Sequence, residues 1–241
     1  MANARLSREI PGFGLDSPAY PTAEAGRFVG LAPGRVRRWL QGYEFTYETK
    51  ASPRFHRSRK KPVVVAESRP AARYASFLDL IDLLLVREFL QLGVSLQKIR
   101  RAFDEVRQRR NITHLAYETF FTLGKRIYLE FQDLDGAMIE LMTGGQMAFP
   151  SMIAQLGRQI EFDPNTKMAV RWYPLHPDRL VVIDPFVSFG HPTISGRRIT
   201  TSTVVDLFFA EGQQLDPVCD WMGVSPAEVT AAVRFENMLA M

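Results

Sequence analysis

The chain has 241 residues, of which 46% are hydrophobic and 23% are charged, a balance typical of a globular protein with a buried core. Its most apolar run, residues 77–90, is interrupted by four charged residues, which argues against a membrane-spanning helix. The first residues lack the apolar stretch of a signal peptide, and Cys219 is the only cysteine. We therefore expect a cytoplasmic protein with no disulfide and no membrane partner.

The net charge of +4 is distributed unevenly along the chain. Residues 1–110 contain 21 Lys and Arg against 11 Asp and Glu, whereas residues 111–241 contain 9 against 15. A strongly basic segment is typical of a protein that binds a polyanion such as nucleic acid. The acidic half is unsuited to that partner, so we expect it to have a different one.

The first two helices predicted along the chain form a helix-turn-helix. Residues 1–19 hold Pro and Gly without periodicity and are predicted to be a flexible arm. Thr22 is expected to cap a helix that starts at Ala23 and ends at Gly30, and Pro33 suits the first turn of a second helix. In that second helix the spacing of apolar residues predicts a buried face formed by Val36, Trp39 and Leu40.

A basic segment follows these two helices. Residues 50–61 contain six Lys and Arg and no acid, and they lie between two β-prone runs, residues 43–49 and 62–67. This pattern predicts a β-hairpin with a basic tip, a wing beside the helices, although a disordered basic loop also fits it. Because arginine stays charged and offers paired donors, we expect these elements to bind DNA phosphates and guanine edges. The predicted DNA-binding residues are Thr22, Arg35, Arg37, Arg38, Gln41, Lys50, Arg54, Arg57, Arg59, Lys60 and Lys61.

Two longer helices are predicted next, one over residues 76–92 and one that starts at Leu96 with Ser95 as its cap. Residues 111–183 show mixed patterns that predict a small α+β section. Its predicted elements are a strand at 126–131, a helix at 150–160, a hairpin around Pro164–Asn165 and a strand at 180–183.

The C-terminal segment, residues 184–241, is predicted to be a second three-helix unit. Ser202 or Thr203 is expected to cap its first helix, and Ser225 with Glu228 forms a capping box before the last one. From Thr203 onward the unit holds six carboxylates and one arginine, so we do not expect it to bind phosphates. Its larger apolar residues suit either a protein interface or a small core: Phe208, Phe209, Trp221 and Met222.

These elements predict a mainly helical α+β fold in four parts. The predicted parts are a flexible arm at 1–19, a winged helix-turn-helix domain at 20–110, an α+β middle section at 111–183 and a helical unit at 184–241. Because helix-turn-helix proteins usually read paired half-sites, we also expect a homodimer.

Patterns that indicate catalysis are missing from the sequence. The four histidines lie far apart, no second cysteine or paired histidine offers a metal site, and no phosphate-cradling glycine loop occurs. We therefore predict that the protein is not an enzyme and uses neither a metal nor a cofactor. An enzyme in the middle section, regulated by the flanking domains, is the weakest alternative.

The N-terminal segments "YPTAEAGRFVGLAPGRVRRWL" and "ARYASFLDLIDLLLVREFLQLGVSLQKIRRAF" resemble the winged-helix DNA-binding domain of MerR-type regulators. The resemblance covers about residues 20–107 and includes Arg73 and Tyr74 before an acidic helix start at Asp79. It implies a DNA-binding fold in which Arg37 occupies the position of an arginine that contacts the DNA backbone.

The segment "VVIDPFVSFGHPTISGRRITTSTVVDLFFAEGQQLDPVCDWMGVSPAEVTAAVRFE", residues 181–236, is similar to VapB-type antitoxins that end in a small helical domain. This resemblance implies a PIN-domain toxin, a metal-dependent ribonuclease, as the partner. An arginine could pair with the carboxylates that hold the metal of such a nuclease. Arg197 and Arg198 lie in an extended segment beside Gly196 and are the candidate toxin contacts, unless they only anchor their own loop.

The two resemblances together predict an antitoxin that neutralises a PIN-domain toxin and represses its own operon by binding operator DNA. A MerR-like regulator that responds to a ligand through a sensor in the middle section, without cysteines, is the alternative.

Overall fold

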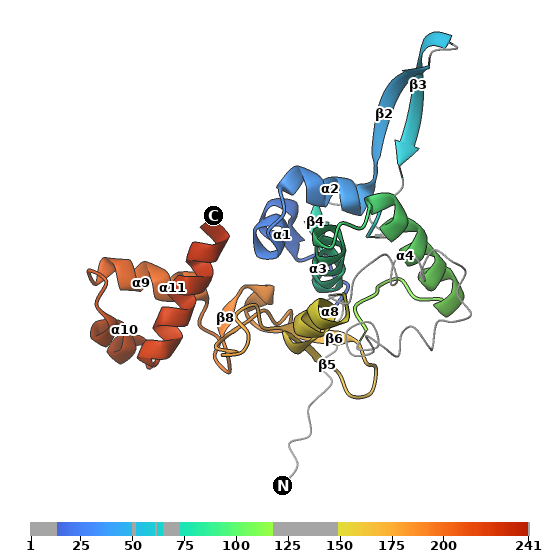
Figure 1. Ribbon diagram of the computed structural model, residues 1–241. Helices are drawn as coiled ribbons and strands as arrows, with labels where there is room; N and C mark the ends of the chain where they lie inside the picture. The colour runs from blue at the N-terminus through green and yellow to red at the C-terminus, as the bar shows by residue number, and fades with distance from the viewer. Residues whose placement is uncertain (1–13, 50–51, 61, 65–72, 118–148, 241) are drawn as a thin grey trace.

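A computed structural model describes residues 14–49, 52–60, 62–64, 73–117 and 149–240, and it shows a mixed α+β fold that is mainly helical (Figure 1). The predicted strand at 126–131 lies outside these residues. The elements are β1 (Tyr20–Pro21), α1 (Thr22–Val29), α2 (Pro33–Gln41), β2 (Tyr43–Thr49), β3 (Ser52–Lys60), β4 (Tyr74–Ala75), α3 (Phe77–Gln91), α4 (Leu96–Arg110), α8 (Phe149–Arg158), β5 (Ile160–Phe162), β6 (Ala169–Trp172), β7 (Val181–Val182), a 3-10 turn (Ser188–Gly190), β8 (Thr193–Ile194), α9 (Thr201–Ala210), α10 (Leu215–Met222) and α11 (Pro226–Ala240).

Helices α1 and α2 are joined by a tight turn, as the sequence predicts. Gly30 ends α1 with φ of 65°, a left-handed conformation that glycine adopts without a steric penalty, and Pro33 begins α2. The predicted apolar face of α2 is buried. The predicted cap is wrong, because Thr22 is itself the first residue of α1, and Pro21, which precedes it, offers no side-chain hydrogen bond.

Strands β2 and β3 form an antiparallel hairpin that projects from the helices in Figure 1. Its register runs from Tyr43 opposite Lys60 to Thr49 opposite Ser52, so the basic segment is the second strand and not the tip. The prediction of a second strand at 62–67 is therefore wrong for residues 62–64, the part that the structure describes. Val63 and Val64 are buried instead, and their N–H groups donate to the carbonyl of Trp39.

Helix α3 is buried around most of its circumference. Its N-terminus has a full capping box, in which Ser76 accepts from the N–H of Asp79 while the Asp79 carboxylate accepts from the N–H of Ser76. The predicted cap of α4 is confirmed, because the Ser95 hydroxyl accepts from the N–H of Lys98.

The predicted hairpin around residues 164–165 is confirmed, since β5 pairs with β6 in antiparallel register. Strand β7 pairs with β8, and Trp172 bridges to Ile183, so these four short strands lie together. In the C-terminal unit, the cap of α9 is Thr200 and not Ser202 or Thr203, because α9 begins at Thr201, two or three residues earlier than those caps imply.

The described residues form two hydrophobic cores, and helix α11 contributes to both. Val229 and Ala232 lie in the smaller core with α9 and α10, whereas Ala231 and Phe235 belong to the larger core, which contains α1, α3 and the middle section. The ring of Phe235 lies 6.5 Å from that of Phe28 in α1. The C-terminal helix is thereby attached to the N-terminal helices. Among the described helices, none combines the length and the apolar character that a membrane span requires.

We expect Phe235→Ala to lower the free energy of unfolding by about 3–5 kcal/mol, because it leaves a cavity where α11 packs against α1. Met238→Ala, on the same helix but 38% exposed, should cost less than about 1 kcal/mol. Urea denaturation of both variants measures the difference. Equal small losses would contradict the role given to Phe235.

Candidate functional site

The exposed face of α2 carries three arginines and no acid. Arg35, Arg37 and Arg38 are exposed, while Val36 and Trp39 fix the opposite face in the larger core. The Arg35 guanidinium lies 6.0 Å from the centre of the Trp39 ring, close enough for a cation–π contact that supports this arginine. The helix therefore presents a concentrated positive charge to solvent.

The basic hairpin begins directly after this helix, since β2 starts at Tyr43. Arg57 and Arg59 are exposed, and Arg57 forms an ion pair of 3.0 Å with Glu44 across the strands. Lys60 lies over the ring of Phe45 at 5.8 Å. The hairpin that carries the predicted cations of β3 therefore starts directly after the helix that carries the predicted cations of α2.

The remaining predicted DNA-binding residues differ in what the structure shows of them. Thr22 and Gln41 are half-buried at the first position of α1 and the last position of α2. Arg54 lies within β3, and the structure does not describe its side chain. Lys50 and Lys61 are outside the described residues.

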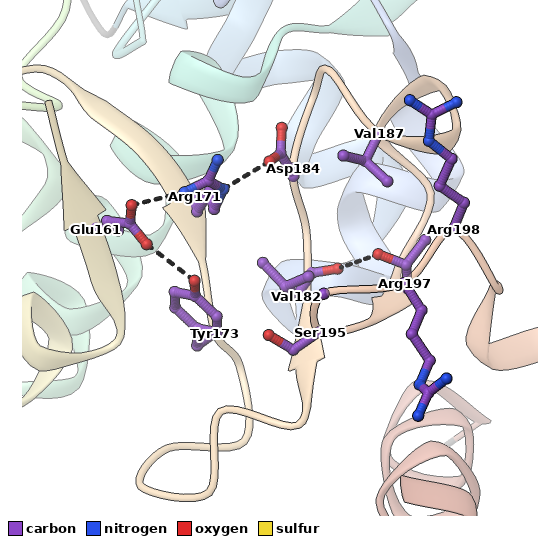
Figure 2. A pocket seen from close by; sticks show the side chains of 11 residues that line it. Glu161, Arg171, Tyr173, Val182, Asp184, Val187, Ser195, Arg197 and Arg198 are labelled. Atoms are coloured by element: carbon purple, nitrogen blue, oxygen red, sulfur yellow. Dashed lines mark hydrogen bonds and ion pairs between the residues drawn. The ribbon is translucent and has the colours of Figure 1, made fainter. Parts of the chain in front are cut away.

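A cavity of about 470 Å³ lies among β5–β8 and the turn that follows β8 (Figure 2). At its floor Arg171 donates to both Glu161 and Asp184, each at 2.6 Å, and the Tyr173 hydroxyl donates to Glu161 at 2.9 Å. Burial lowers the pKa of Arg171, but the hydrogen bond and charge of Asp184 together with the charge of Glu161 outweigh burial and raise it. The floor is thus an ionic network of one guanidinium and two carboxylates, which the sequence did not reveal because its bonded pairs are 10 to 13 residues apart.

The two predicted toxin contacts lie on the rim of this cavity, and Figure 2 shows their side chains extending away from each other and from Arg171. Arg197 donates from Nε to Glu228 at 3.0 Å, which ties the turn to the capping box of α11. Burial raises the pKa of Glu228, but hydrogen bonds from Ser225 and Arg197 outweigh it and hold that pKa below its usual value. Arg198 is exposed, and its carbonyl accepts from the Ser188 hydroxyl at 3.2 Å.

The apolar residues of the C-terminal unit divide between the two predicted roles. Phe208 and Met222 are half-buried against the smaller core. Trp221 and Phe209 are 78% and 54% exposed. Large exposed aromatic side chains are typical of protein interfaces, where they supply much of the contact area.

A buried ionic cluster around His114 was not predicted. The His114 ring lies 3.0 Å from Asp82 through Nδ1 and 3.0 Å from Asp16 through Nε2, and Asp82 also lies 3.8 Å from Arg107. The ligand atoms of Asp16, Asp79 and His114 lie within 4.8 Å of one another, a spacing at which a metal could bind. Because both ring nitrogens of His114 already contact carboxylates, we assign the cluster a structural role.

Comparisons with known proteins give both sequence and fold relatives. Residues 181–235 match a family model described as "Protein of unknown function (DUF433)". The Mycobacterium tuberculosis protein named "Putative antitoxin VapB45" is 25% identical over 91% of this chain and 94% of its own length. "Uncharacterized HTH-type transcriptional regulator Rv1830" from the same organism is 34% identical over 103 residues, which are 41% of this chain and 44% of the regulator. The crystal structure of Rv2018 from Mycobacterium tuberculosis shares the fold, with a TM-score of 0.66 and 22% identity over 91% of this chain and 98% of that chain.

The His114 cluster predicts a pH-dependent stability. Burial lowers the pKa of His114, but hydrogen bonds from the ring to Asp16 and Asp82 outweigh burial and raise the pKa from 6.5 to about 10. Below pH 6.5 both the folded and the unfolded chain carry the proton, so the stabilisation is fully present. As the pH rises from 6.5 to about 10, the stabilisation is lost, by at most about 1.4 kcal/mol per pH unit.

Urea denaturation at pH 6.5 and at about pH 10 measures this loss of stability. The matched variant is His114→Gln, because glutamine keeps hydrogen-bonding groups but cannot titrate. We expect the variant to lose less stability over the same interval. An identical pH dependence in both proteins would contradict the assignment.

Proposed function

We propose that this protein is a DNA-binding regulator that also acts as an antitoxin. The observation that carries the proposal is the run of three exposed arginines on α2 beside a basic hairpin, in a chain whose C-terminal part is acidic. The names of an antitoxin and of HTH-type regulators among its sequence relatives support the same two roles.

For DNA binding, we propose that residues 20–110 form a winged helix-turn-helix domain in which α2 enters the major groove. Arg35, Arg37 and Arg38 would then reach phosphates or guanine edges, where a planar guanidinium can donate two parallel hydrogen bonds. The cations of β3 would neutralise phosphates beside the groove. A homodimer would place two copies of α2 on paired half-sites of the operator.

The DNA-binding proposal is tested with the combined variant Arg35→Ala, Arg37→Ala and Arg38→Ala. Each phosphate contact that is lost should reduce the slope of log affinity against log salt by about 0.9. The affinity for the duplex upstream of the coding sequence should fall at least tenfold, a loss of about 1.4 kcal/mol or more in binding free energy. Fluorescence anisotropy over a salt series measures both quantities. Arg234→Ala, a cation of α11, is the control and should leave them unchanged. An unaltered affinity and slope in the combined variant would show that α2 is not the recognition helix.

For antitoxin activity, we propose that residues 184–241 bind a PIN-domain ribonuclease. Arg197 is committed to Glu228 within the chain, whereas Arg198 extends from the rim of the cavity into solvent. Arg198 is therefore the better candidate to pair with the metal-binding carboxylates of the nuclease. The exposed rings of Trp221 and Phe209 would add apolar contact area.

The antitoxin proposal predicts different results for the two neighbouring arginines. Arg198→Ala should weaken binding to the nuclease encoded beside this gene at least tenfold, because a charge-assisted contact is lost, while thermal stability is unchanged. Arg197→Ala removes a partly exposed ion pair and should change stability by less than about 1 kcal/mol and binding by less than about fivefold. Isothermal titration calorimetry and thermal unfolding make the comparison. If neither variant alters binding, the rim does not contact the toxin.

A second function is favoured by the cavity beneath that rim. Its volume of about 470 Å³ lies within the range of small-molecule sites, which supports the alternative of a regulator that responds to a ligand. In that case a small molecule, and not a nuclease, would change the affinity for duplex DNA.

A further inference from the structure

One face of the β2–β3 hairpin carries a row of aromatic rings. Tyr43, Phe45 and Tyr47 alternate along β2 and therefore lie on the same face of the hairpin. Their ring centres are 6.0 Å and 5.8 Å apart, and Tyr43 and Tyr47 are 36% and 44% exposed. Among the described elements, β2 and β3 contact chiefly each other, so the rings do not belong to either hydrophobic core. A contiguous apolar row of this kind is typical of a binding surface.

Cations lie on both faces of the hairpin, and Lys60 shares the face that carries the rings. The register places Lys60 opposite Tyr43, the small side chain of Ser58 opposite Phe45, and His56 opposite Tyr47. Lys60 lies 5.8 Å from the centre of the Phe45 ring. On the other face, Arg57 and Arg59 lie opposite Thr46 and Glu44.

The charge of the hairpin selects the kind of partner. Residues 43–61 contain six Lys and Arg and two Glu, a net charge of +4 that equals the net charge of the whole chain. Two copies of such a surface would repel each other, whereas a polyanion would be attracted to it. Charge complementarity therefore favours nucleic acid over a second copy of this chain.

The spacing of the rings then indicates whether the nucleic acid is a duplex or a single strand. Bases in a B-form duplex are 3.4 Å apart along each strand and cover each other's faces, so a protein reaches only their edges. Rings about 6 Å apart can stack on consecutive bases only when those bases are unpaired and separated.

We infer that the β2–β3 hairpin is a binding site for single-stranded nucleic acid. Tyr43, Phe45 and Tyr47 stack on unpaired bases, while Lys60 on the same face neutralises phosphates. The arginines on the other face add to the net positive charge that attracts the strand. This activity is separate from the duplex binding proposed for α2, because it uses the faces of bases and not their edges.

The test uses the full chain and fluorescein-labelled oligonucleotides of about 12 nucleotides, a length within the usual site size, as oligo-dT, oligo-rU and a mixed-sequence duplex. The variant combines Tyr43→Ser and Tyr47→Ser, which removes two stacking platforms and no charge. We expect it to bind the single strand at least about tenfold more weakly, with an unchanged salt slope, and to bind the duplex within about twofold of the original chain. Thr46→Ala, on the opposite face, should behave like the original chain.

Binding of either single strand that depends on the rings supports the inference. The oligonucleotide that binds more tightly, oligo-dT or oligo-rU, identifies the ligand as DNA or RNA. An unchanged affinity for both single strands would overturn it, as would an equal loss on single strand and duplex. Sedimentation of the ring variant as a monomer, with single-strand affinity retained, would overturn it too, since the rings would then form a protein interface. If the arginine variant of α2 loses duplex binding while the ring variant binds single strands normally, this inference fails and the DNA-binding proposal stands.

Discussion

The burial of two carboxylates in helix α3 is the constraint on which the N-terminal part of the structure depends. Asp79 and Asp82 are fully buried, and a carboxylate without partners in such a position costs several kcal/mol. Asp79 accepts through Oδ2 from the N–H of Ser76 in the capping box of its own helix, and its Oδ1 lies 4.0 Å from Nδ1 of His114. Asp82 accepts from the backbone N–H of Leu115 and lies beside His114 and Arg107. The need to neutralise Asp82 therefore positions α4 and the segment after it against α3. The surface formed by α1, α2 and the hairpin is built on that framework.

Helix α11 connects this framework to the acidic C-terminal unit. One stretch of the helix supplies Val229 and Ala232 to the smaller core, and Phe235 then lies against Phe28 of α1 in the larger core. The turn before the helix is held by Glu228, which accepts from Arg197 as well as from the Ser225 backbone. The surfaces proposed for nucleic acid and for a protein partner thus differ in charge, and α11 links them because it packs into both hydrophobic cores.

Local patterns in the sequence were sufficient to predict most helices, the apolar face of α2, the Ser95 cap and the Ser225–Glu228 capping box, because each depends on residues within about one or two helical turns. The sequence pattern predicts the second strand of the hairpin at 62–67, whereas the basic segment itself is that strand, because a basic composition fits an exposed strand as well as a tip. Strand pairing depends on alternation across two segments, and composition does not report it. The Arg171 network and the His114 cluster were missed for a related reason. Their members are distant in the sequence, as with Asp16 and His114, and each charged residue alone is typical of a solvated surface.

We propose that this chain binds duplex DNA through α2 and the hairpin and leaves its acidic C-terminal unit free for another partner. Hydrogen–deuterium exchange of the full chain, with and without the duplex upstream of its coding sequence, tests that claim most directly, because it reports protection along the backbone. The account predicts slower exchange in Pro33–Gln41 and in the strands of the hairpin, with Leu215–Met222 unchanged. Protection of α10 and α11 without protection of α2 would contradict it.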